Sequence, residues 1–291
     1  MYRRSTGEKI FTVFNYAFMA FMVIVTLYPC LYVLFASVSD PVKLYGGSKL
    51  LLWPRGFTTV GYEYVLDYDL IWTGYKNTFF YVVSGTTLSV FLTIMAAYCL
   101  SRRNLVGQNL IIFGMVFTNY FWGGMIPTFL VVRAMHILDT PLAIILPGVI
   151  NTTNFIISLT YFRGMPYELE EASKIDGATN MQVLFKVLVP LAKPVIFVMV
   201  LYYAVALWND YMSALLYLND QSLFPLQYVL QQILVVGTAL QGVDANLEQS
   251  IALSETIKYA IIVVSTIPIL CVYPFIQRHF VKGVMVGAIK G

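Results

Sequence analysis

The sequence predicts an all-α integral membrane protein with six transmembrane helices. Hydrophobic residues make up 59% of its 291 residues and charged residues only 11%, whereas soluble domains carry about 25% charged residues. The mean hydropathy is +0.74. Apolar runs of about 20 residues, the length that a helix needs to cross a membrane, recur along the chain and are separated by polar turns. We therefore interpret residues 1–291 as a single transmembrane domain.

Each expected span has its own signals. The first follows a basic N-terminus, and its run Ile10–Val38 exceeds the roughly 7–15 residues of a signal-peptide core. This length favours a retained anchor, although FASVS at its end resembles a cleavage site. The second begins with aromatic residues, which are typical of a membrane interface. Gly123, Gly124 and Pro127 interrupt the third, and such breaks must face protein or a wet cavity rather than lipid. The expected spans cover about residues 11–38, 72–100, 110–132, 143–162, 194–218 and 256–280.

The segment between the fifth and sixth spans, residues 219–255, is expected to be an outer loop. Within it, Phe224–Leu240 is apolar enough to suggest a seventh span. Polar residues and a glycine interrupt this run, so its unbroken apolar stretches are too short to cross a membrane. We expect a re-entrant or surface helix here.

The distribution of basic residues predicts the orientation. The six-span topology gathers one set of basic residues on one side of the membrane, and the long outer loop has no Lys or Arg. Because loops rich in Lys and Arg stay in the cytoplasm, both termini are predicted to be cytoplasmic. A seventh span would move the basic C-terminal tail outside. The basic residues on the predicted cytoplasmic side are Arg3, Arg4, Lys9, Arg102, Arg103, Arg163, Lys174, Lys186, Lys193, Arg278, Lys282 and Lys290, against Lys43, Lys49, Arg55, Lys76, Arg133 and Lys258 outside.

A polar island, Pro166–Pro194, lies on the predicted cytoplasmic side. Pro166 and the glutamates after it suit the first turn of a helix, and Gly177 suits its end. A second short helix is expected to start near Thr179–Asn180. The first helix should carry an i,i+4 pair of Glu170 and Lys174 on its surface. One of its faces should be formed by mostly small side chains, from Leu169, Ala172, Ser173 and Asp176. The face of the second helix should consist of Met181, Leu184, Phe185 and Leu188.

This island resembles the EAA loop of the permease subunits of ATP-binding-cassette importers. The match consists of Glu171-Ala172-Ser173, Asp176-Gly177-Ala178, Phe185 and Val189-Pro190. Ser173 stands where the motif has a second alanine, and it is also small. The sequences GGMIPT at 123–128 and FPLQ at 224–227, together with the Gly-rich tail, are similar to those of carbohydrate-importer permeases of the LplC- and YtcP-like branch, related to the maltose-type permeases. The resemblance extends from Phe11 to Gly291.

The resemblance implies an EAA-type coupling helix pair in residues 163–193 that docks on a separate ATPase. The expected coupling residues are Leu169, Glu171, Ala172, Ser173, Asp176 and Gly177. The expected partners are a homologous second permease subunit, two ATPase subunits, an extracellular or periplasmic sugar-binding protein, an oligosaccharide and membrane lipid, with no nucleic acid. ATP and Mg²⁺ would bind to the ATPase, so this chain would need no cofactor. The expected location is the bacterial plasma membrane, and the tail Val281–Gly291 is a second candidate contact with the ATPase.

Polar and aromatic residues inside the predicted spans are candidates for the substrate pathway. Trp208-Asn209-Asp210-Tyr211 resembles a fifth-span pattern of sugar-importer permeases, and it combines flat apolar faces with hydrogen-bonding groups. An Asp within a span is costly unless it faces a cavity or a partner. The alternative interpretation is interhelical hydrogen bonding that holds the bundle together. The candidate pathway residues are Asn119, Tyr120, Trp122, Asn154, Tyr203, Trp208, Asn209, Asp210 and Tyr211.

No motif for catalysis or metal binding is apparent. The chain has no GxxxxGK[ST] sequence, its two histidines are far apart, and its three cysteines lie in separate apolar runs, so we expect neither an enzyme nor a metal site. A secondary transporter or channel independent of an ATPase is the alternative, although such proteins usually show repeated halves or ion-coupling charges. A membrane-embedded glycan enzyme would need a pair of catalytic acids within the spans, and none is found.

Overall fold

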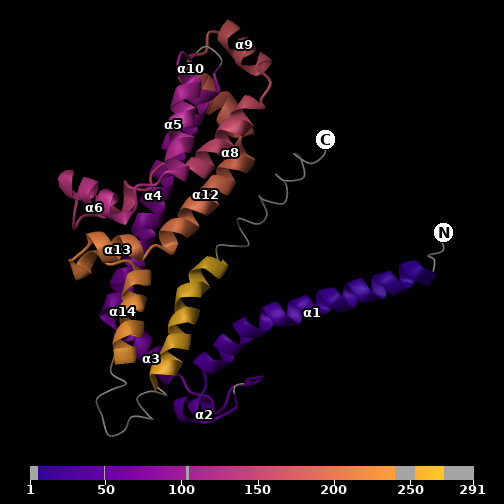
Figure 1. Cartoon of the computed structure of the whole chain (residues 1–291), viewed down its shortest axis with the longest axis vertical. Helices are drawn as coiled ribbons and strands as arrows, with labels where there is room; N and C mark the ends of the chain where they lie inside the picture. Colours follow the sequence, from indigo (N-terminus) through magenta and orange to yellow (C-terminus); the bar gives the residue numbers. More distant parts are fainter. Residues whose placement is uncertain (1–5, 49, 103–104, 240–252, 272–291) are drawn as a thin grey trace. The chain divides into compact units, whose positions relative to one another are not determined.

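The computed structural model describes residues 6–48, 50–102, 105–239 and 253–271, and these are predominantly helical (Figure 1). They fall into two compact units, residues 1–69 with 232–268 and residues 70–231 with 269–291. The predicted all-α architecture is thus observed in the described ranges. Several basic residues used to predict the orientation, including Arg3, Arg4 and Arg103, and the tail Val281–Gly291 lie outside the described residues. The helices are α1 Thr6–Ser37, α2 Pro41–Tyr45, α3 Val60–Leu66, α4 Asp69–Ser101, α5 Gln108–Tyr120, α6 Met125–Ala134, α7 Pro141–Ile145, α8 Thr152–Arg163, α9 Glu168–Ile175, α10 Asn180–Gln182, a π-helix η1 Val183–Leu188, α11 Val189–Leu191, α12 Lys193–Trp208, α13 Met212–Tyr217, a 3₁₀ turn η2 Gln221–Leu223, α14 Leu226–Ala239 and a last helix Leu253–Cys271.

Within the described ranges, three helices are long and apolar enough to cross a membrane: α1, α4 and Leu253–Cys271. The first two correspond to the predicted spans 11–38 and 72–100, and the third contains the start of the predicted span 256–280, whose end lies outside the described residues. The pairs α5–α6 and α10–α11 with α12 also pass the length and hydropathy criteria, but they are bent by 119° and 84°. The described residues therefore contain up to five spans by length and composition.

Breaks divide the predicted spans in the middle of the chain. The predicted third span, which Gly123, Gly124 and Pro127 were expected to interrupt, is two helices, and Gly124 at the break has a φ of +92°, which an L side chain rarely adopts. The predicted fourth span, 143–162, is divided between α7 and α8 by residues 146–151, and the α8 segment has only 12 residues. The predicted fifth span ends at Trp208, and a break at 209–211 separates it from α13.

The first unit contains α1, α2, α3 and the last helix. Tyr32 of α1 contacts Tyr259 of the last helix edge to face, with ring centroids 5.7 Å apart. Gly61 of α3 packs so close to Thr256 that a Cβ atom would lie 3.2 Å from its methyl group. Asp40 caps α2 by accepting hydrogen bonds from two backbone N–H groups. The first two contacts join α1 and α3 to the last helix.

The second unit has a core formed by α4, α8, the helices after α9, and α12. Phe155, Phe162, Leu184 and Met199 are fully or almost fully buried in it. Between helices that cross a membrane, such side chains stabilise the bundle through close van der Waals packing rather than through removal from water. In Figure 1, α9 and α10 lie at one end of these helices, and α6 and α13 lie toward the other.

The predicted outer loop 219–255 contains α14, which has 14 residues and is shorter than a spanning helix. Its first turn packs against α4: Leu226 is fully buried, and its backbone N–H donates to Thr78 Oγ1 at 2.8 Å. Gly74 permits this approach, because a Cβ there would lie 3.0 Å from the Leu226 backbone. Residues 240–252 of the loop lie outside the described residues.

Candidate functional site

The two short helices predicted in the 163–193 loop are present. The helix α9 carries three glutamates in its first turn, which favour the positive end of the helix dipole. It ends before Gly177, whose φ of +80° requires a glycine, and the Ala178 N–H donates to Ser173 O at 2.9 Å. Thr179 then forms a capping box with Gln182 that starts α10. Local sequence signals therefore fix both ends of the turn between the two helices.

The exposed face of α9 differs in part from the predicted one. Glu171, Ala172 and Asp176 are exposed, as a docking face requires. Leu169 and Ser173 are half-buried, and the Ser173 hydroxyl donates to the carbonyl of Leu169 at 2.7 Å. Ile175 was missed, although it lies one turn after Glu171 and its side chain is 86% exposed. The outward surface of α9 is therefore formed by Glu171, Ala172, Ile175 and Asp176.

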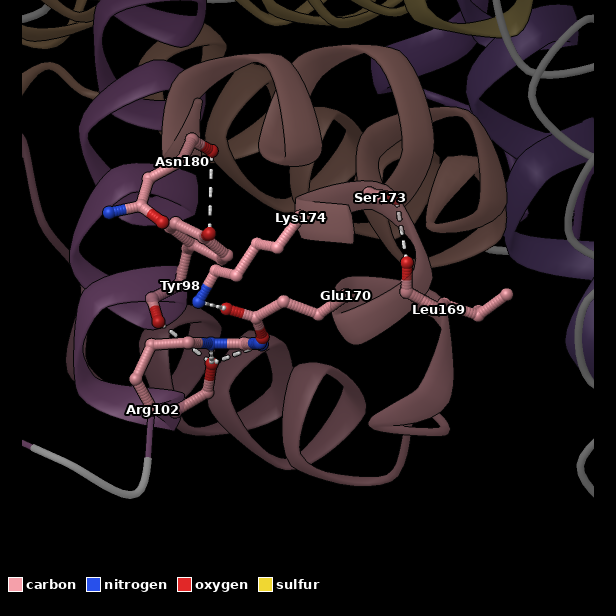
Figure 2. Close-up of polar contacts among 8 residues, drawn as sticks. Tyr98, Arg102, Leu169, Glu170, Ser173, Lys174 and Asn180 are labelled. Carbon is pink, nitrogen blue, oxygen red and sulfur yellow. Dashed lines mark hydrogen bonds and ion pairs between the residues drawn. The ribbon is translucent and has the colours of Figure 1, made fainter. Parts of the chain in front are cut away.

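The inward face of α9 carries a buried carboxylate that the sequence interpretation placed on the surface. Glu170 is only 3% exposed. Its Oε1 accepts from Lys174 Nζ at 2.8 Å, which is the predicted i,i+4 pair, and its Oε2 pairs with Nη1 of Arg102 (Figure 2). Burial lowers the pKa of Arg102, while nearby Tyr98, Tyr167 and Cys99 raise it. The Arg102–Glu170 pair could not be inferred from helical spacing, because 68 residues separate its members.

The segment after α10 buries part of its predicted apolar face. Val183, Leu184 and Leu188 are buried, whereas Met181 and Phe185 are 53% and 43% exposed. Residues 183–188 form a π-helix, whose wider turns change which side chains share a face. Phe185 stacks on Phe91 of α4, with ring centroids 6.3 Å apart. The loop is therefore anchored to α4 through this ring pair as well.

The predicted pathway residues occupy three different environments. The first group lies at the α5–α6 break: Asn119 is exposed, and Tyr120 and Trp122 are 78% and 70% exposed. The second group, Asn154 and Tyr203, is buried between helices. The Tyr203 hydroxyl is 2.7 Å from the Thr93 hydroxyl and accepts from the Asn151 N–H at 2.9 Å. These contacts fit the alternative interpretation, in which such residues hold the bundle together.

The third group lies at the α12–α13 break. Trp208 is buried edge to face against Phe79, and its indole N–H has no hydrogen-bond partner in the described part of the chain. Asn209 donates its side-chain amide to Val205 O at 2.8 Å. Asp210 accepts from the Ser213 N–H at 3.0 Å, and Tyr211 is 38% exposed. At this break the indole N–H of Trp208 is therefore buried without a partner among the described residues, and Tyr211 next to it is partly exposed.

Comparisons with known proteins agree with the resemblance seen in the sequence. Residues 1–286 match the family described as "Binding-protein-dependent transport system inner membrane component". The polygalacturonan/rhamnogalacturonan transport system permease protein YtcP of Bacillus subtilis (strain 168) is 42% identical over 288 residues, which cover 98% of this chain and 99% of that protein. Protein LplC of the same organism is 39% identical over 283 residues, which cover 97% and 96%.

A solved structure of an ABC importer has the same fold as this chain. The crystal structure of a bacterial ABC transporter involved in the import of the acidic polysaccharide alginate contains a chain that matches this one with a TM-score of 0.85 and 34% sequence identity. The match covers 96% of this chain and 100% of that chain. Together with the apolar helices, these similarities show a multi-pass protein of the plasma membrane. The chain belongs to the inner membrane components of binding-protein-dependent transport systems, and it is the permease subunit of an ATP-driven importer rather than an enzyme.

Proposed function

We propose that this chain forms half of the translocation pathway for an oligosaccharide or another breakdown product of a polysaccharide. The observation that carries this proposal is the near full-length identity of 42% with a polygalacturonan/rhamnogalacturonan permease. The alginate importer, with a TM-score of 0.85, also takes an acidic polysaccharide. Two full-length relatives whose named substrates are polysaccharides favour this class over a monosaccharide or an ion.

The proposed complex contains this chain, a homologous second permease, two ATPase subunits and an extracellular or periplasmic sugar-binding protein. ATP and Mg²⁺ would bind to the ATPase subunits. Family membership argues against a secondary transporter or channel that works without an ATPase. We further propose six crossings with both termini in the cytoplasm, an orientation that rests on the positions of the basic residues.

Energy would enter through the outward surface of α9. Glu171 and Asp176 offer carboxylates to a basic groove, and Ile175 offers an apolar anchor that is 86% exposed in the isolated chain. Ala172 is small enough for close approach by a partner. Leu169, Ser173 and Gly177 would support this surface by fixing the shape of the helix and its turn. The loop and the helices that it joins would then tilt as the ATPase closes and opens.

The sugar would pass the two helix breaks. Trp208, Asn209, Asp210 and Tyr211 lie at one break, and Asn119, Tyr120 and Trp122 lie at the other. Aromatic faces suit the CH face of a sugar ring, and amides suit its hydroxyls. We assign Asn154 and Tyr203 to packing of the bundle, because both are buried and Tyr203 contacts two neighbouring helices.

Co-purification and uptake together test the proposal. The complex is purified through a tag on this chain, and bound ATPase is quantified for the unaltered protein, Glu171→Lys and Ile175→Asp. Both variants should stay in the membrane, lose most of the bound ATPase and lose uptake, because each places a wrong charge on the docking surface. Lys186→Gln, at an exposed lysine of the same loop, should behave like the unaltered protein.

The substrate class is tested with a panel of labelled oligosaccharides. The panel contains oligomers of galacturonan, rhamnogalacturonan and alginate, with arabino-oligosaccharides as a neutral set. Uptake of any of these that depends on this chain and on ATP supports the proposal. An absence of stoichiometric ATPase on the unaltered protein, or uptake without ATP, would contradict it.

A further inference from the structure

The last turn of α4 meets the 163–193 loop through a set of polar contacts. Arg102, directly after α4, pairs with Glu170 of α9, and Glu170 also binds Lys174. Figure 2 shows the two cations on either side of the Glu170 carboxylate. The side chain of Glu170 is 4% exposed, against 22% for Arg102 and 47% for Lys174. The carboxylate is therefore the buried centre of the contact.

Tyr98, one turn earlier on α4, extends the contact to α10. The guanidinium carbon of Arg102 lies 4.6 Å from the centre of the Tyr98 ring, a cation–π distance. The Tyr98 hydroxyl donates to the carbonyl of Asn180 at 3.3 Å. The Ser101 hydroxyl accepts from Nε and Nη2 of Arg102 at 3.1 and 3.0 Å, which fixes the direction of the guanidinium. The end of α4 thus holds both helices of the loop.

Two open clefts flank this contact among the described residues. One of about 340 Å³ and another of about 460 Å³ are both lined by Arg102, Tyr167 and Glu170. The contact of Glu170 with the end of α4 is therefore a polar one with clefts beside it. A buried carboxylate is tolerated only with charged partners, so the position of α9 depends on where Arg102 is.

We propose that the Arg102–Glu170 pair is a mechanical link through which the 163–193 loop moves α4. The inference rests on the proposed function, in which the opposite face of α9 docks on the ATPase. The backbone carries motion from the loop to its covalent neighbours α8 and η1 with α12, and apolar packing joins these helices to the middle of α4. The Arg102–Glu170 pair adds a direct contact between α9 itself and the end of α4. Arg102, Glu170 and Tyr98 are positioning residues that transmit the movement of the loop to α4 when the ATPase closes and opens.

The test measures motion of α4 and docking separately. Spin labels are attached to Val83→Cys on α4 and Leu130→Cys on α6, both more than half exposed and both outside the link. The native cysteines Cys30, Cys99 and Cys271 are replaced by serine. Distances between the labels are recorded for the complex with its ATPase, without nucleotide and after trapping with ATP and vanadate.

Four forms of the chain are compared: unaltered, the pair Arg102→Gln with Glu170→Gln, the charge exchange Arg102→Glu with Glu170→Arg and Lys174→Glu, and Lys186→Gln as the control. The neutral pair avoids leaving an unpartnered buried charge, so it should fold and bind the ATPase. After trapping, it should lower the population with the trapped-state distance, relative to the population with the untrapped distance, by roughly threefold to tenfold. The charge exchange should restore much of the response, and the control should keep it.

The outcomes separate this inference from the proposed function. Normal ATPase binding with a lost α4 response in the neutral pair supports the link. An unchanged response in that variant overturns it, and so does the absence of any distance change in the unaltered complex, since the link requires α4 to move. A merely structural role predicts a lower melting temperature with an unchanged response in the molecules that remain folded. Loss of ATPase binding by the unaltered chain would instead refute the docking proposal itself.

Discussion

The 163–193 loop and the α12–α13 break both interrupt apolar helices, but different forces hold them in place. In the loop, a capping box starts α10, and a glycine with a φ of +80° forms the turn after α9. A buried ion pair holds α9 to the end of α4. At the break, Asn209 and Asp210 bond only to residues of their own segment, and the indole N–H of Trp208 lacks a partner in the described ranges. The polar groups of the loop are thus satisfied within this chain, whereas the indole N–H at the break is not satisfied by the described residues.

The largest loss of uptake is expected from Gly177→Pro, which prevents the turn between α9 and α10 from forming. Proline fixes φ near about −65°, and the backbone of Gly177 needs +80°. The turn between α9 and α10 cannot form, so uptake should fall to background while the protein stays in the membrane. ATPase binding and uptake in membrane vesicles measure this.

Gly177→Ala is the matched control for this change. A Cβ at Gly177 would meet no atom within 4 Å, so alanine introduces only backbone strain of about 1–2 kcal/mol. Partial uptake is therefore expected. Full uptake by the proline variant would show that the turn is not a rigid part of the coupling mechanism.

The two regions also differ in how far the sequence predicts them. The helix pair of the loop could be predicted, because its signals lie within a few residues of one another: Pro166, the glutamates, Gly177 and Thr179. The sequence correctly predicted the ion pair between Glu170 and Lys174. It did not predict the burial of Glu170 against Arg102, because no spacing rule connects residues in different helices. The break after Trp208 was missed because Asn209 and Asp210 were interpreted as polar residues inside one continuous span, 194–218, and hydropathy does not report a change of direction.

A smaller loss of uptake is expected from substitutions at the α12–α13 break. Asn209 is exposed, and its only side-chain bond is within its own segment. If the break binds sugar, Asn209→Ala should lower uptake at limiting substrate by roughly twofold to tenfold, the value of one hydrogen bond. Trp208→Ala should lower uptake further, because it also removes a buried ring.

Both break variants should keep normal ATPase binding, which separates them from the loop variants. The measurement is uptake of the oligosaccharide identified in the panel, together with co-purified ATPase. Equal transport by Asn209→Ala and the unaltered protein would remove this residue from the pathway. Loss of ATPase binding would show that the two regions are not independent.

The smallest effect is expected at the turn between α6 and α7, which supports the end of α13. Asp139 has a φ of +57°, and its Oδ1 accepts from the N–H groups of Asn219 and Asp220 at 2.8 and 2.9 Å. The bond from Asp220, and then that from Asn219, lowers the pKa of the Asp139 carboxyl group. This turn is therefore closed by its own chain, as the 163–193 loop is.

Because the pKa is lower in the folded state, the charged form stabilises the fold above the ordinary pKa of the group, and this contribution is lost as the pH falls through the lowered value. Asp139→Asn keeps the acceptor oxygen and removes the charge, so it should lower the melting temperature slightly at neutral pH. That difference should disappear in acid, as thermal unfolding in detergent at several pH values would show. Uptake should stay normal, because the turn supports the far side of the break without contacting sugar. A difference in melting temperature that persists in acid would mean that the charge of Asp139 does not stabilise the turn.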